Sequence, residues 1–136
     1  RLDGRLFLQK RGLHKQESPG LWDSSVAGHV DAGETYDACC VREIEEEIGI
    51  RMEEMPKRLF KLVASPQTGM EFCWVYRLVT DLELALDYTE METGQWFAQA
   101  QVDQWLRDSA EDFAESFRTI WHRFSQCKEV DVVEYV

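Results

Sequence analysis

Residues 28–50 read Gly28-His-Val-Asp-Ala-Gly-Glu34-Thr-Tyr-Asp-Ala-Cys-Cys-Val-Arg42-Glu43-Ile-Glu-Glu46-Glu47-Ile-Gly49-Ile50. After Glu34, apolar residues recur at the three- and four-residue spacing of one helix face: Ala38, Val41, Ile44 and Ile48. Gly49 stands where a helix C-terminus favours glycine. The segment therefore predicts a loop followed by an amphipathic helix.

Three carboxylates share another side of that helix. Glu43, Glu46 and Glu47 stand at i, i+3 and i+4 and converge on one face, whereas Glu45 points away and serves as an internal control. Carboxylates held this close repel one another, and oxygen-ligated Mg²⁺ or Mn²⁺ is the natural ion to neutralise them. Because Mg²⁺ bridges carboxylates to phosphates, a diphosphate substrate would follow. The alternative is a solvated glutamate face with an ordinary Arg42–Glu46 surface pair.

The spacing of the whole segment decides between these alternatives. It fills every fixed position of the Nudix box, G-x5-E-x7-R-E-U-x-E-E-x-G-U with U aliphatic, from Gly28 to Ile50. The chain thus resembles the Nudix hydrolases directly over residues 28–50. The resemblance implies an α/β fold, in the form of an α/β/α sandwich with a mixed central sheet, and hydrolysis of phosphoric anhydrides.

The resemblance also implies roles for the residues of the box. Glu46 and Glu47 would be the principal metal ligands, and Glu43 a further ligand or the general base. Arg42 would orient the carboxylates by pairing with one of them. Glu34 would support the loop and the helix without contacting the metal.

Two further ligands are expected outside the box. The backbone carbonyl of Ala27 directly precedes it, and such proteins often use that carbonyl as a metal ligand. Family members also recruit one more acidic residue from elsewhere in the chain, and Glu71 is the candidate because it opens a strong strand after a turn. For Glu71 a solvent-facing strand end is the alternative interpretation.

The stretch before the box resembles the isopentenyl-diphosphate isomerase branch of the Nudix superfamily, over Arg11-Gly-Leu-His-Lys15, Pro19-Gly20, Trp22, Ser25-Val26 and Gly28-His29. That isomerase would use a catalytic Cys directly before Gly28, whereas this chain has Ala27, whose methyl group cannot carry a proton. The resemblance makes Arg11 and Lys15 candidate phosphate contacts, with solvated surface charges as the alternative. His29 is a candidate metal or substrate contact, or a hydrogen-bonded structural histidine.

The remaining pattern predicts one domain over residues 1–136. Strands are expected over residues 6–9, 25–30, 59–64, 72–80 and 95–98, and a short helix over 102–108. A longer helix over 113–124 carries a stripe expected in the core: Phe113, Phe117, Ile120 and Phe124. The turn-like Asp3-Gly4 implies a partner strand upstream of Arg1, and residues 130–136 form an edge strand or a frayed end.

Composition limits the partners of the protein. A net charge of −11 argues against binding of a nucleic-acid polymer through its backbone, which needs clustered Lys and Arg. The longest apolar run, residues 72–76, is too short to cross a membrane. The cysteines show no metal or disulfide spacing and indicate reduced thiols in the cytoplasm: Cys39, Cys40, Cys73 and Cys127. Trp22 and Trp96 are expected in the core, and the alternative is that they stack on a base or line an apolar pocket.

The sequence therefore predicts a divalent-metal-dependent pyrophosphohydrolase for a nucleoside-diphosphate-linked or other small diphosphate substrate. Two alternatives remain open. One is an isopentenyl-diphosphate-isomerase-like enzyme, which Ala27 and the complete box oppose. The other is a non-catalytic nucleotide-binding sensor, which the intact acids oppose.

Overall fold

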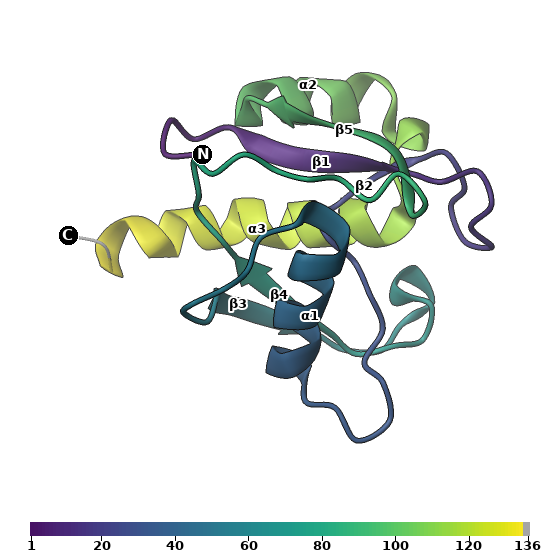
Figure 1. The fold of residues 1–136 in the computed structure, drawn as a ribbon. Coiled ribbons are helices and arrows are strands. Elements are labelled where there is room, and N and C mark those ends of the chain that lie inside the picture. Colours follow the sequence, from purple (N-terminus) through teal and green to yellow (C-terminus); the bar gives the residue numbers. More distant parts are fainter. Residues whose placement is uncertain (135–136) are drawn as a thin grey trace.

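A three-stranded antiparallel sheet in the order β2-β1-β5 forms the centre of the fold (Figure 1). The computed structural model describes the backbone of residues 1–134 and the side chains of residues 1–126. In the sheet, β1 (Leu6–Arg11) lies between β2 (Trp22–Asp23) and β5 (Met91–Phe97). Both neighbours of β1 thus come from within the chain, and the strand expected upstream of Arg1 stays a prediction.

The side chains of β1 alternate between two hydrophobic clusters, one on each face of the sheet. Leu6 and Leu8 face a cluster formed with α2 (Gln99–Asp108) and α3 (Glu115–Glu134). Phe7 faces the other cluster, together with Ile44 and Ile48 of α1 (Tyr36–Ile48). Helices therefore cover both faces of the sheet, and the expected α/β/α sandwich is confirmed. The strand pairs are antiparallel, and a parallel bridge joins Trp22 to Phe113.

The helix α1 begins at Tyr36, two residues after the predicted start at Glu34, and it ends before Gly49, as the sequence predicts. The Thr35 side chain accepts a hydrogen bond from the Ala38 backbone N–H at the N-terminus. At the C-terminus Gly49 adopts the left-handed conformation with φ of 71°. The expected apolar face is partly wrong, because Ala38 is exposed and Val41 is only half-buried. Cys39, Glu47 and the two isoleucines form the buried side of the helix instead.

A second antiparallel pair, β3 (Lys57–Leu62) and β4 (Cys73–Arg77), lies beside the first turn of α1. Asp37 of α1 joins them, since its carboxylate accepts hydrogen bonds from Tyr76 Oη at 2.6 Å and from Arg58 Nε at 2.8 Å. The short 3-10 helix η1 (Pro66–Thr68) makes the turn between the two strands, and η2 (Ala110–Asp112) precedes α3. The hairpin is thus attached to the helix that carries the box.

Three sequence predictions need correction. Residues 25–30 form no strand, because the pairing partner of β1 is the two-residue segment Trp22–Asp23 just before them. Phe113 precedes α3 instead of starting it, and the apolar stripe continues through the buried Trp121 while Ile120 is only half-buried. Residues 130–134 belong to α3, so they are no edge strand, and residues 135–136 lie outside the described residues.

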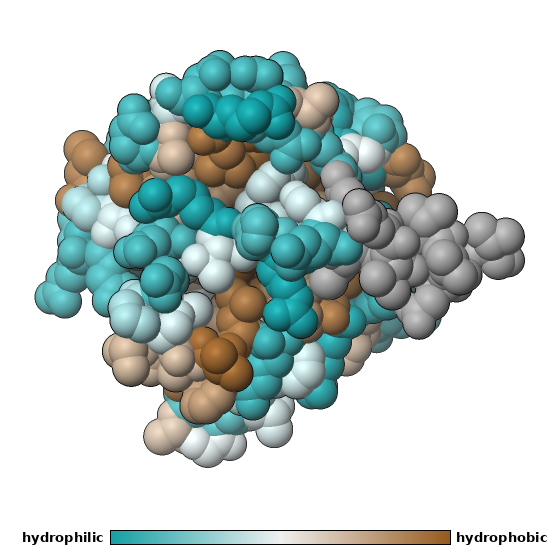
Figure 2. All heavy atoms as spheres, turned by 180° about the vertical axis from the view of Figure 1, so that it is seen from behind, coloured by the Kyte–Doolittle hydropathy of each residue, from teal (hydrophilic) through white to brown (hydrophobic). Residues whose placement is uncertain are grey.

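One face of the molecule is mainly hydrophilic, with separate apolar patches (Figure 2). Figure 2 shows these patches among hydrophilic residues on the face opposite to that of Figure 1. Several large apolar side chains are exposed, among them Leu13, Val63, Met70 and Phe72. Within the described part of the chain, no helix has the length and apolar character needed to cross a membrane.

Candidate active site on the acidic face of α1

Arg42 stands at the centre of a cluster of carboxylates. Its guanidinium donates two hydrogen bonds to Glu34, from Nε at 2.8 Å and from Nη2 at 3.0 Å. Nη1 donates to Glu43 at 2.8 Å and to Glu46 at 3.1 Å. Asp31 adds a looser ion pair at 3.4 Å. One arginine therefore joins the loop before α1 to two of the three acids on the helix face.

The hydrogen bonds between Glu34 and Arg42 keep both side chains charged. The hydrogen bonds from Arg42 are the main reason that the pKa of Glu34 falls to about 2. The same bonds raise the pKa of Arg42 further above its usual range. Glu34 also accepts a hydrogen bond from the Asp31 backbone N–H at 3.1 Å, so its carboxylate holds both the loop and Arg42. The structure thus places Glu34 next to Arg42. Among the described residues, no hydrogen bond joins Glu34 to Glu47.

Glu47 lies in a different environment from the other acids. Its side chain is buried, with 5% exposed, and its Oε1 accepts a hydrogen bond from Gln9 Nε2 of β1 at 3.3 Å. The second oxygen, Oε2, is buried and has no hydrogen-bond partner among the described residues. Burial, and then the negative charge of Glu43, raise the pKa of Glu47 to about 8, although the Ala27 backbone and Gln9 act in the opposite direction.

The close approach of Glu43 to the backbone of Gly28 explains why the box begins with glycine. A Cβ atom at this position would lie 2.3 Å from Cδ and 2.5 Å from Oε1 of Glu43. The backbone of the loop therefore runs directly against this carboxylate. Any larger residue would have to displace the Glu43 side chain.

The donors present fit a hard divalent cation. Carboxylate oxygens of Glu43, Glu46 and Glu47, with the Ala27 carbonyl, are of the type that Mg²⁺ prefers, and the unpartnered Glu47 Oε2 is a buried acceptor in need of a positive partner. Among the described residues, however, no three His, Cys, Asp or Glu side chains already stand in a metal-binding arrangement. Arg42 holds Glu43 and Glu46 in their present positions.

The structure brings together the two candidates that lie outside the acidic face. His29 Nε2 lies 3.1 Å from Glu71 Oε2, and both side chains are largely exposed. Glu71 precedes β4, which begins at Cys73, one residue later than expected. The pair connects the first residues of the box to the β3–β4 hairpin. Within the described residues, neither side chain makes a hydrogen bond or an ion pair with Glu43, Glu46 or Glu47.

The structure pairs the candidate phosphate contacts with acids of their own. Arg11 Nη1 lies 3.1 Å from Oδ2 of the buried Asp23, and Arg11 Nε donates to the Glu17 carbonyl. Lys15 forms a close ion pair with Glu90. In the part of the chain that the structure describes, no hydrogen bond or ion pair joins Arg11 or Lys15 to the acids of α1. A role in phosphate binding stays a prediction for both.

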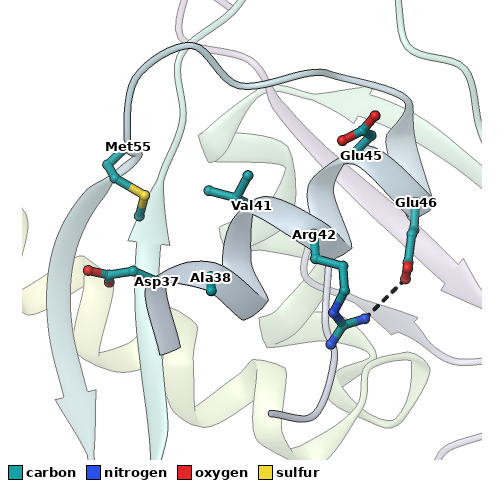
Figure 3. Close-up of a pocket in the computed structure, with 7 residues that line it drawn as sticks. All are labelled: Asp37, Ala38, Val41, Arg42, Glu45, Glu46 and Met55. Atoms are coloured by element: carbon teal, nitrogen blue, oxygen red, sulfur yellow. Dashed lines mark hydrogen bonds and ion pairs between the residues drawn. The ribbon is translucent and has the colours of Figure 1, made fainter. Parts of the chain in front are cut away.

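The outward side of α1 borders a surface hollow, which Figure 3 shows with Arg42 and Glu46 paired at its edge. Val41 lies here, together with Glu45, and Met55 faces them from the segment before β3. Glu45 thus lies on the outer side of the helix, as its place in the sequence predicts. The cysteines of α1 show no activation, since burial raises the pKa of Cys39 and of Cys40 to about 11.

Sequence reasoning missed Gln9 as a residue of the site. Its side chain is 3% exposed, which is rare for a glutamine. The signal was available in the alternation of β1, because Gln9 shares a strand face with Phe7, and that face packs against α1. Trp22 and Trp96, by contrast, lie against other aromatic rings of the interior, as expected.

Comparisons with known proteins agree with this geometry. The family model of the NUDIX domain matches residues 1–119. An uncharacterized Nudix hydrolase of Pseudomonas aeruginosa is 34% identical over 93 residues, which cover 68% of this chain and 54% of that protein. An isopentenyl-diphosphate delta-isomerase of Kocuria rhizophila is 30% identical over 101 residues, which cover 71% of this chain and 56% of the isomerase.

A solved structure shares the fold. The crystal structure of DR0079 from Deinococcus radiodurans matches with a TM-score of 0.72 and 26% identity, over 92% of this chain and 75% of that one. A sandwich of this kind, with a complete box on its first helix, is the Nudix class of structure. The chain belongs to the Nudix family. Enzymes of this family generally act on diphosphate substrates and use divalent metal ions. The chain spans a little over half the length of the first curated relatives that it matches.

Proposed function

We propose that this protein is a divalent-metal-dependent pyrophosphohydrolase that cleaves a nucleoside-diphosphate-linked or other small diphosphate substrate. The observation that carries the proposal is the acidic face of α1, where Glu47 has a buried oxygen without a partner beside Glu43 and Glu46. A buried carboxylate of this kind is stable only with a proton or a cation. A divalent cation would satisfy it and attract the diphosphate.

In this proposal the residues of the box have different roles. Glu46, Glu47 and the Ala27 carbonyl would hold Mg²⁺ or Mn²⁺, which when bound lowers the pKa of a coordinated water and offsets phosphate charge. Glu43 would be a further ligand or would accept the proton of the attacking water. Arg42 would keep the carboxylates oriented, and Glu34 would hold Arg42 in place. Glu71 and His29, paired at the edge of the hairpin, are candidates for a further ligand and a substrate contact.

The test is an activity panel with purified protein. Nucleoside triphosphates, nucleotide sugars, dinucleotides, coenzyme A, thiamine diphosphate and prenyl diphosphates are assayed with Mg²⁺ for release of phosphate, diphosphate or monophosphate. We expect turnover of at least one class, with loss of activity after chelation of divalent ions. No turnover with any divalent ion, together with tight nucleotide binding, would support a sensor instead.

Isomerisation is the second candidate, because several relatives are named isopentenyl-diphosphate delta-isomerase. Ala27 opposes it, since its methyl group can neither donate a proton to the double bond nor accept one from the neighbouring carbon. The alanine side chain leaves only the backbone of residue 27 to act in the site. We expect no conversion of isopentenyl diphosphate to its isomer, and measurable conversion by purified protein would reverse the order of the two candidates.

A further inference from the structure

Gln9 lies where the central strand meets the acidic helix. Its Nε2 donates to Glu47 Oε1 at 3.3 Å and to the Ser25 carbonyl at 3.4 Å. An amide nitrogen has two hydrogens, and these two bonds use both. Because the side chain is almost completely buried, a lost bond would leave a polar group without water to replace it. Gln9 therefore fixes α1 and the loop before the box relative to β1.

The two partners of Gln9 belong to the two segments that carry the candidate metal ligands. Glu47 is one of the ligands, and Ser25 precedes the Ala27 carbonyl by two residues. The Ser25 hydroxyl donates to the Phe7 carbonyl, so the loop is attached to β1 at a second point. The position of Glu47 relative to the loop is thus set by contacts that converge on β1.

The chemistry of an amide suits this position. Gln9 binds Oε1 of Glu47 and leaves Oε2 without a partner. A lysine or arginine here would neutralise the carboxylate and compete with a cation, and an acid would repel it. A neutral donor holds one oxygen in place and adds no charge that would compete with a metal for the carboxylate.

We propose that Gln9 is a positioning residue for the metal site, which holds the Glu47 carboxylate and the Ala27 loop so that Glu47 Oε2 stays available to a divalent cation. The inference rests on the proposed function, because it assigns Glu47 as a metal ligand. Gln9 contacts neither substrate nor metal in this proposal. It acts through Glu47.

A double-mutant cycle on Mn²⁺ affinity tests this role. Free Mn²⁺ is titrated by electron paramagnetic resonance with the wild-type chain, Gln9→Met, Glu47→Gln and the double variant. Methionine has about the length of glutamine but no N–H donors. We expect Gln9→Met to weaken Mn²⁺ binding about 10- to 100-fold, but by less than about twofold in the Glu47→Gln background. The matched control is Gln95→Met, an exposed position of β5, which should leave the affinity unchanged.

The outcomes separate the inference from the proposed function. Wild-type affinity in Gln9→Met, or equal losses in both backgrounds, would overturn the role of Gln9. Unchanged affinity in Glu47→Gln would instead overturn Glu47 as a ligand and, with it, the proposed site. Thermal unfolding without metal checks that each variant folds. If Gln9→Met does not fold, Gln9→Asn replaces it; its amide is one methylene short of both partners, and we expect the same loss.

Discussion

The negative charge of Glu47 is costly in the metal-free protein, because the carboxyl is buried. Its pKa is about 8 in the folded state, against 4.5 for an ordinary glutamate. Between these values the folded state holds a proton that the unfolded state has released, so stability falls as the pH rises. We expect the free energy of unfolding of the metal-free protein to fall between about pH 5 and pH 8. Urea denaturation at stepped pH measures it.

Substitution isolates the contribution of this carboxyl. Glu47→Gln removes the titrating group, so the decline between pH 5 and pH 8 should become smaller. Glu45→Gln changes an exposed glutamate two positions away and should leave the decline as in the wild type. An unchanged pH dependence in Glu47→Gln would show that the carboxyl is not held in the buried, unpartnered state described above.

Gly28→Ala is expected to affect catalysis more than folding. The new Cβ would occupy the place of the Glu43 carboxylate, which is the far end of a flexible side chain and can move aside. We expect kcat to fall about 10- to 100-fold, because the displaced group belongs to the proposed site. The melting temperature should change little. The control is Ala32→Ser in the exposed part of the same loop, and wild-type kcat in Gly28→Ala would contradict the placement of Glu43.

The sequence predicts that the acids of the box converge, but not how they differ. Spacing places Glu43, Glu46 and Glu47 on one helix face, and in the structure Arg42 pairs with the first two instead of with one. The sequence could not show that Glu47 is the buried one of these three acids, because its burial depends on the packing of α1 against β1. Its contact with Gln9 joins residues 38 positions apart, and no local pattern reveals such a pair.

Among the elements, α1 has a C-terminus that requires a glycine. Gly49 has a φ of +71°, and a Cβ there would lie 2.7 Å from Cβ and 3.0 Å from the carbonyl oxygen of Ala85. We expect Gly49→Ala to lower the free energy of unfolding by about 2 kcal/mol or more, since backbone strain adds to the overlap. Urea denaturation of the purified variant measures the loss.

Gly33→Ala is the matched control for Gly49→Ala. Gly33 also has a positive φ, +81°, but nothing lies within 4 Å of the added Cβ. Gly33→Ala should therefore lower the free energy of unfolding only by the strain of the left-handed conformation, about 1 kcal/mol. Equal losses in the two variants would show that the contact with Ala85 contributes nothing.

Prediction from sequence succeeded for elements with local signals. It failed where contacts with distant parts of the chain determine the conformation or the burial of a residue. Gly49 and the apolar spacing predicted α1. Residues 25–30 have the composition of a strand, yet they form a loop, which Gln9 holds through the Ser25 carbonyl. Val41 fits the periodicity of the buried face but lies beside the surface hollow.

At the scale of the whole molecule, the sheet lies between the hydrophobic cluster around Phe113 and the side that carries the proposed active site. Phe113 is fully buried among residues of α2 and α3, on the face of β1 opposite to α1. We expect Phe113→Ala to lower the free energy of unfolding by about 3–5 kcal/mol, while kcat of the folded protein stays near the wild-type value. Phe72→Ala, at an exposed position, should cost less than about 0.5 kcal/mol. A large change in kcat of folded Phe113→Ala would contradict this separation.

Family and fold class could be predicted from one segment, because the box combines a fixed loop length with a helix of fixed polarity. The substrate could not. In the proposed function the acids handle the diphosphate, and the rest of the pocket selects the group attached to it. Arg11 and Lys15 show the difficulty, since the sequence marks them as free cations and the structure pairs each with an acid.

The measurement that tests the central claim most directly is the turnover of Glu47→Gln, with Glu45→Gln as its control, on a substrate identified in the panel and at saturating Mg²⁺. The two changes are chemically identical, and they differ in that one residue is buried on the acidic face and the other lies on the outer side of the same helix. The account predicts that Glu47→Gln lowers kcat by about 100-fold or more and that Glu45→Gln keeps wild-type turnover. Wild-type turnover in both variants would contradict a metal-dependent site on this face of α1.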